Sequence, residues 1–140
     1  MNPFQSLFEY ERFIYTLQQR YASISQSTLT LARRGRGFAV LTGELIFSDR
    51  FRLVAYEILT WDGGDLTIQR YGYEIWSGSV KLFWYDPQPH PDDLALASTH
   101  PHHKHIPPDV KHNRIPAPGF RFDGPNLPLL IEEIEAMLAG

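Results

Sequence analysis

Apolar side chains at both ends of the chain recur at the spacing of a helix. In residues 2–20 they fall every three or four positions, and Asn2 followed by Pro3 is typical of a helix start. Residues 126–139 show the same periodicity, with Asn126 as the expected cap. The polar side of this second segment carries glutamates that we expect to face water: Glu132, Glu133 and Glu135. Both segments are therefore predicted to be amphipathic helices that pack on the core.

Between these segments the pattern changes to the alternation and short apolar runs of β-strands. Residues 25–85 contain several such runs, separated by glycine-containing turn sequences at 62–65 (DGGD) and 77–79 (SGS). Connections this short join antiparallel neighbours, so we expect a meander of about four to five strands. Within it, Tyr71 and Tyr73 are predicted to point to the same face. The chain is thus predicted to be an α+β protein whose sheet is flanked by the two terminal helices.

After Tyr85 the composition changes abruptly. Ten of the eleven prolines and all six histidines lie beyond this residue. Proline removes a backbone donor and fixes φ, so a proline-rich segment suits neither a central strand nor a helix interior. We therefore expect a long His/Pro-rich loop laid over the fold. Loops of this length inside a small domain are usually functional or disordered, which directs attention to this segment.

The overall composition is that of one globular domain. A length of 140 residues suits a single domain spanning residues 1–140, and 43% hydrophobic residues suffice for its core. The net charge of −3 neither requires nor excludes a polyanionic partner. With no cysteine, disulfides, thiolate metal sites and cysteine nucleophiles are excluded. No stretch resembles a secretory signal or a membrane span, which favours a cytoplasmic protein without a membrane partner.

The candidate chemistry lies in the histidine run 100–105 (HPHHKH). Pro101 disfavours helical backbone before it, so the run is predicted to be extended. In an extended chain His102 and Lys104 point to one side, and His103 and His105 point to the other. Four histidines in six positions are more than packing alone requires, so we expect this run to carry a function.

The first interpretation is acid–base cleavage of an RNA phosphodiester that needs no metal or other cofactor. Imidazole titrates near neutrality, so His102 could exchange one proton while His105, or His103, exchanges the other. The Lys104 ammonium would stabilise charge on the phosphoryl oxygens. The groups expected to orient these rings are His90 and Asp86. The residues expected to bind the substrate are Tyr71, Tyr73, His100, Lys111 and Arg114.

Two other interpretations stay open. Imidazoles at His-x-His spacing are good ligands for a divalent metal such as zinc, copper or nickel, and Asp86 or His90 could complete the set. Alternatively, the proline-stiffened loop is a non-catalytic surface that binds a partner protein, with some rings simply bonded to main-chain carbonyls.

Three strings of residues resemble the TumE family of toxin components from bacterial toxin–antitoxin pairs. They are Tyr71-x-Tyr73, the segment 84–90 (WYDPQPH) and the segment 101–105 (PHHKH). The family pattern has an arginine where this chain has Trp84 and an aromatic residue where it has His100. The resemblance implies a cytoplasmic bacterial protein that acts on growth and is neutralised by a cognate antitoxin, often a DNA-binding protein. RNA as the substrate follows from the histidine chemistry and from the habits of small toxins, and a homodimer is a candidate assembly.

Overall fold

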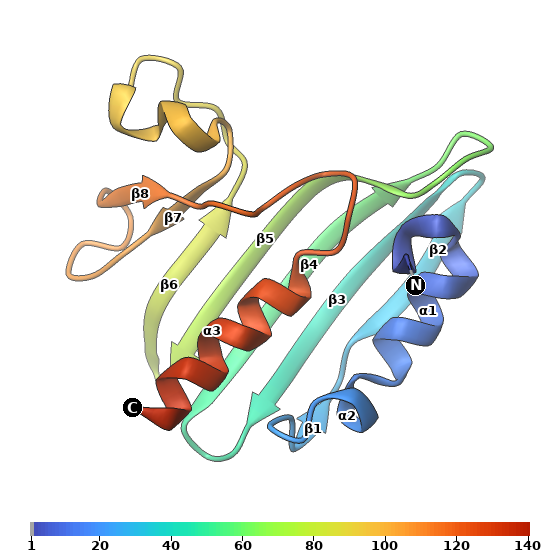
Figure 1. The fold of residues 1–140 in the computed structure, drawn as a ribbon, viewed down its shortest axis with the longest axis horizontal. Helices are drawn as coiled ribbons and strands as arrows, with labels where there is room; N and C mark the ends of the chain where they lie inside the picture. The colour runs from blue at the N-terminus through green and yellow to red at the C-terminus, as the bar shows by residue number, and fades with distance from the viewer. Residues whose placement is uncertain (1) are drawn as a thin grey trace.

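The computed structural model describes residues 2–140 and consists of one antiparallel sheet with its helices packed on one face (Figure 1). The α+β class is confirmed, but the sheet has eight strands, more than the four to five predicted. The helical elements are η1 (Pro3–Gln5), α1 (Leu7–Tyr15), α2 (Leu17–Arg20), η2 (Leu94–Thr99) and α3 (Leu127–Ala139). The strands are β1 (Gln26–Ser27), β2 (Thr30–Gly35), β3 (Phe38–Phe47), β4 (Phe51–Thr60), β5 (Thr67–Ser77), β6 (Val80–Asp86), β7 (His103–His105) and β8 (Arg114–Pro116).

The N-terminal helix begins later than its sequence predicts. The Asn2 side chain does cap a turn by accepting from the Phe4 amide at 3.0 Å, but that turn is the short 3₁₀ element η1. The regular helix α1 starts at Leu7, where the Ser6 hydroxyl accepts from the Glu9 amide at 3.1 Å. Two capping residues in succession therefore divide the segment, each satisfying amides that the next turn leaves free.

The strands from β3 to β6 form the predicted meander, with hairpin turns at the two glycine-containing segments. A bulge interrupts β5, since Ile58 pairs with Arg70 while the next residue, Leu59, pairs with Ile68. The extra residue resets the alternation, so Ile68 and Tyr71 are both buried although they lie three positions apart. Tyr71 and Tyr73 share the buried face as predicted.

Two strands lie within the segment that was expected to be a loop, and this expectation was wrong. β7 pairs with β6 and β8 pairs with β7, so the sheet continues beyond β6 (Figure 1). Pro101 and Pro107 flank a stretch without proline, whose amides are free to pair with the strand before them. The proline content of the whole segment concealed this short strand.

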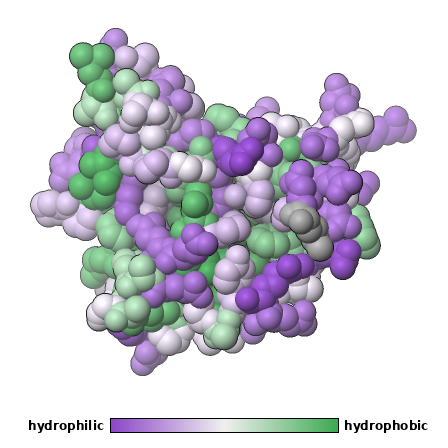
Figure 2. Space-filling view, in the orientation of Figure 1, coloured by the Kyte–Doolittle hydropathy of each residue, from purple (hydrophilic) through white to green (hydrophobic). Residues whose placement is uncertain are grey.

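The core lies between the sheet and the pair α1 and α3, which run across the same face (Figure 1). In Figure 2 polar residues predominate on the outer sides of these helices, with apolar residues between them. Asn126 does not cap α3 with its side chain; instead it accepts from the Arg121 amide and donates to Tyr73 Oη. No helix formed by residues 2–140 has the length and apolar character required to cross a bilayer.

Candidate functional site

The register of β6, β7 and β8 determines which side chains meet at this edge of the sheet. Asp86 is directly opposite His103, and the neighbouring strand β8 places Arg114 opposite His105. Because side chains alternate along a strand, these four point to the face that α1 and α3 leave uncovered. Lys104, between the two histidines, points to the α3 side. The predicted alternation of this run is therefore confirmed.

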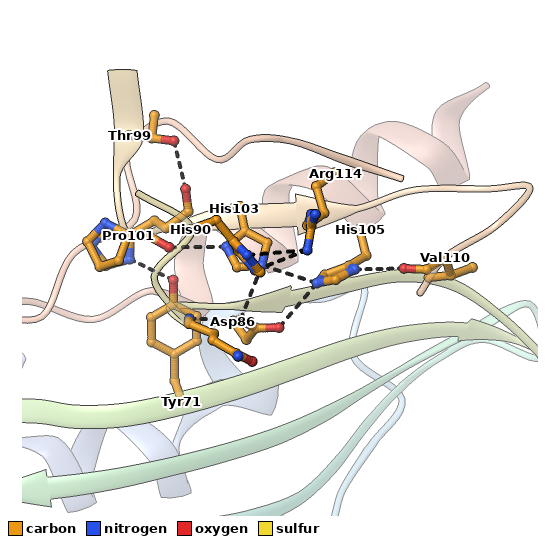
Figure 3. Close-up of polar contacts among 11 residues, drawn as sticks. Tyr71, Asp86, His90, Thr99, Pro101, His103, His105, Val110 and Arg114 are labelled. Atoms are coloured by element: carbon orange, nitrogen blue, oxygen red, sulfur yellow. Dashed lines mark hydrogen bonds and ion pairs between the residues drawn. The ribbon is translucent and has the colours of Figure 1, made fainter. Parts of the chain in front are cut away.

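A carboxylate and two imidazoles converge on this face (Figure 3). Asp86 Oδ1 lies 3.2 Å from His103 Nε2, and Asp86 Oδ2 lies 3.2 Å from His105 Nε2. The two Nε2 atoms are 3.1 Å apart. Both rings are nearly inaccessible, with 1% of His103 and 4% of His105 exposed. We call these three residues the Asp86–His103–His105 cluster.

Main-chain carbonyls orient both rings of the cluster. His103 Nδ1 lies 3.1 Å from the Pro101 carbonyl oxygen, and His105 Nδ1 lies 2.7 Å from that of Val110 (Figure 3). A carbonyl oxygen can only accept, so each Nδ1 carries a proton and donates it. Burial is the main cause that lowers the pKa of His103, which favours its neutral form. A neutral ring held in this way turns the lone pair of Nε2 toward the cluster.

His90 and Arg114 stand next to the cluster. The His90 ring meets the His103 ring edge-on at 4.9 Å between centroids, and Arg114 Nη1 lies 3.2 Å from His90 Nε2. Burial, followed by the Arg114 charge, lowers the pKa of His90. Arg114 Nε is buried and has no hydrogen-bond partner among residues 2–140. The guanidinium therefore retains a donor for an anion.

A hollow of about 680 Å³ opens beside the Asp86 carboxylate. Trp84 forms part of its wall and stacks on the His105 ring at 4.3 Å between centroids. Its lining combines aromatic rings with polar ends, and includes Gln69, Arg70, Tyr71, Trp84, Gln88 and Phe122. We call it the aromatic hollow. It connects the cluster to a space large enough for a small planar group.

Two of the predicted catalytic residues lie elsewhere. Lys104 Nζ bonds to the Glu133 carboxylate of α3, on the far side of β7 from the cluster. Glu133 thus does not face water as its helical position predicted. His102 stacks on Tyr71, with its Nδ1 2.6 Å from Tyr71 Oη, and burial is the first cause that lowers its pKa. The structure therefore brings neither Lys104 nor His102 to the cluster.

The predicted substrate-binding residues are also divided. Arg114 lies at the cluster and Tyr71 lines the aromatic hollow. Tyr73 is fully buried and donates to Glu57, so its ring offers no surface to a ligand. His100 and Lys111 are exposed on turns outside the cluster.

Sequence reasoning did not identify Gln69, Gln88 or Phe122 as lining a site, and no local motif marks them. The position of His105 was better encoded. The strings Trp84-Tyr85-Asp86 and His103-Lys104-His105 alternate in the same way, and pairing them antiparallel puts Asp86 against His103. That complementary alternation was present in the sequence.

The fold and the site together define an α+β protein with a one-sided antiparallel sheet and a carboxylate–imidazole cluster at its extended edge. The chain belongs to the TumE toxin family, because the family model described as Toxin TumE matches residues 12–138. It has no significant match among curated proteins or among solved structures.

Proposed function

We propose that this chain is the toxin of a toxin–antitoxin pair, acts in the bacterial cytoplasm, and arrests growth by cleaving RNA at the Asp86–His103–His105 cluster. The family supports the toxin role and, with it, neutralisation by a cognate antitoxin protein. The observation that carries the reaction is the convergence of two imidazoles on one carboxylate beside a cation with a free donor.

The chemistry assigns a proton transfer to each part of the site. The cluster takes the proton of a ribose 2′-hydroxyl as its oxygen attacks phosphorus, and the bond from phosphorus to the 5′-oxygen breaks. The His90 imidazolium gives a proton to that leaving oxygen, and its lowered pKa makes it a stronger acid. Arg114 stabilises the charge on the phosphoryl oxygens, the role that the sequence analysis assigned to Lys104.

The aromatic hollow suits the base next to the cleaved phosphate. Unpaired bases stack on aromatic side chains and are recognised through hydrogen bonds at their edges. Trp84 and Phe122 supply apolar ring surface, and Arg70, Gln69 and Gln88 supply donors and acceptors. Single-stranded RNA is therefore the proposed substrate class.

The test is inducible expression of the wild type and of Asp86→Asn, which keeps the side-chain shape but removes the charge. At equal soluble yield the wild type is expected to arrest growth and to fragment cellular RNA, leaving 2′,3′-cyclic phosphate ends. Asp86→Asn is expected to restore growth and to leave RNA intact.

His112→Ala is the matched control, because this histidine is exposed and pairs with Asp109 away from the cluster. It should remain as toxic as the wild type. Arrest by Asp86→Asn at the wild-type level would contradict the proposed centre. Arrest with intact RNA would instead favour the non-catalytic protein-binding interpretation.

A further inference from the structure

The cluster presents three lone-pair donors to one another and gives them no proton of their own. Both imidazole Nδ1 protons are donated to the carbonyls of Pro101 and Val110. In the neutral rings, the Nε2 atoms of His103 and His105 therefore face each other and a carboxylate as bare acceptors. Such an arrangement is repulsive unless a cation lies between the three groups.

The spacing of these atoms suits a bound metal ion. Protein nitrogen and oxygen ligands lie about 2.0–2.2 Å from a zinc-like ion, so two ligands at ordinary angles are about 3.0–3.4 Å apart. The three separations here are 3.1 Å between the nitrogens and 3.2 Å from each nitrogen to its nearest carboxylate oxygen. A single position can therefore contact one atom from each of the three residues.

The surroundings of the rings also match those of metal ligands. A metal-bound histidine almost always donates its other N–H to a carbonyl or carboxylate, which fixes the tautomer and the ring orientation. His103 and His105 both have this second bond, and Trp84 stacks on the His105 ring. These contacts hold the lone pairs in place before any ion arrives.

We propose that Asp86, His103 and His105 form a binding site for a divalent transition-metal ion, with zinc as the preferred probe. Two imidazoles and one carboxylate suit zinc and related ions, and three protein ligands leave coordination positions for water or for a phosphate oxygen. Binding of the ion does not depend on the proposed RNA cleavage; only its catalytic use rests on that proposal. In that use, a hydroxide on the ion takes the 2′-hydroxyl proton and becomes water.

The experiment is calorimetric titration of ZnCl₂ into the full chain, purified without a histidine tag and treated with a chelator that is then removed. We expect one ion per chain. Asp86→Asn should weaken binding by about 10-fold or more and His105→Ala by about 100-fold or more, because each removes a direct ligand whose supports alone are worth about 10–100-fold. His112→Ala, an exposed histidine outside the cluster, should bind as the wild type does.

A second measurement guards against loss of folding in the His105 variant. Cobalt(II) bound to the wild type should give visible absorption bands, and Asp86→Asn, whose shape is conserved, should shift or lose them while its far-ultraviolet circular dichroism is unchanged. Absence of zinc binding by the folded wild type would overturn the site. So would binding that both cluster variants retain in full. Zinc binding by a chain that neither arrests growth nor cleaves RNA would leave the metal site standing and refute only the proposed function.

Discussion

The ammonium of Lys104 bonds to the carboxylate of Glu133, and so joins β7 to α3 across the side of the sheet that faces away from the cluster. The same carboxylate accepts from Tyr85 Oη of β6. Lys104 also lies over the Phe83 ring, 4.0 Å from its centroid. These contacts explain why a lysine stands between two histidines of the run: its side chain fastens the short strand β7 to the body of the protein.

We therefore expect Lys104→Met to lower the free energy of unfolding and to spare the chemistry. The loss should be about 1 kcal/mol, since the pair is only partly buried but Glu133 keeps one donor, Tyr85. Urea unfolding followed by tryptophan fluorescence measures it, and Lys111→Met, at an exposed lysine, is the control. Loss of RNA cleavage without loss of stability would return Lys104 to the catalytic role that its sequence position suggested.

Arg114 is the cation that the site leaves with a free donor. Arg114→Gln is expected to reduce RNA cleavage by about 100-fold or more, the usual effect of removing a donor that stabilises developing charge. The melting temperature should change little, because the Nε atom of this side chain has no protein partner within residues 2–140. Initial rates on a short single-stranded RNA measure the effect.

Arg121→Gln provides the comparison for that variant. Arg121 is exposed, and its guanidinium pairs with Asp123 at 2.7 Å. A cleavage rate for Arg121→Gln equal to that of Arg114→Gln would indicate a general effect of positive charge on RNA binding, and would contradict a specific role for Arg114.

The parts of this structure that the sequence could predict are those governed by neighbours along the chain. Alternation assigned Tyr71 and Tyr73 to one face and separated Lys104 from His103 and His105, because the period of a strand does not depend on what it packs against. The glycine turns likewise set the meander.

The parts that escaped prediction depend on distant partners. Lys104 meets Glu133 from another element, and Tyr73 meets Glu57, so neither pairing has a local signal. The strand β7 forms because β6 offers it an edge, which propensity and proline counting cannot reveal. For the same reason His102, the neighbour of His103 in sequence, is directed to Tyr71 instead of the cluster.

The hydrogen bond between Tyr71 and His102 gives a test of this structural role. The Tyr71 hydroxyl is the polar partner of a buried imidazole nitrogen at 2.6 Å. Tyr71→Phe leaves that nitrogen without a protein partner, so we expect a loss of about 1–2 kcal/mol in the free energy of unfolding. Tyr56→Phe, at an exposed tyrosine of β4, should change stability by much less. Equal stability of the two variants in urea would show that the bond contributes nothing.

Glu57 should make the stability of the protein depend on pH. This carboxyl is fully buried, Tyr10 donates to it at 2.6 Å, and Tyr73 donates to its other oxygen. Burial raises its pKa from 4.5 to about 7, although the bonds from the two tyrosines act in the opposite direction. Between these values the folded chain holds a proton that the unfolded chain has released.

The sign follows from that difference in protons. The stabilisation by Glu57 is complete below pH 4.5 and is lost as the pH rises through about 7. Within this window the free energy of unfolding should fall by up to about 1 kcal/mol per pH unit relative to Glu57→Gln, which has no proton to lose. Urea titrations of both proteins from pH 4.5 to pH 8 give the difference directly, and Glu44→Gln at the partly exposed partner of Arg52 is the control. A constant difference between the wild type and Glu57→Gln across this range would mean that the carboxyl does not change its protonation state there, and that Tyr10 and Tyr73 hold it ionised throughout.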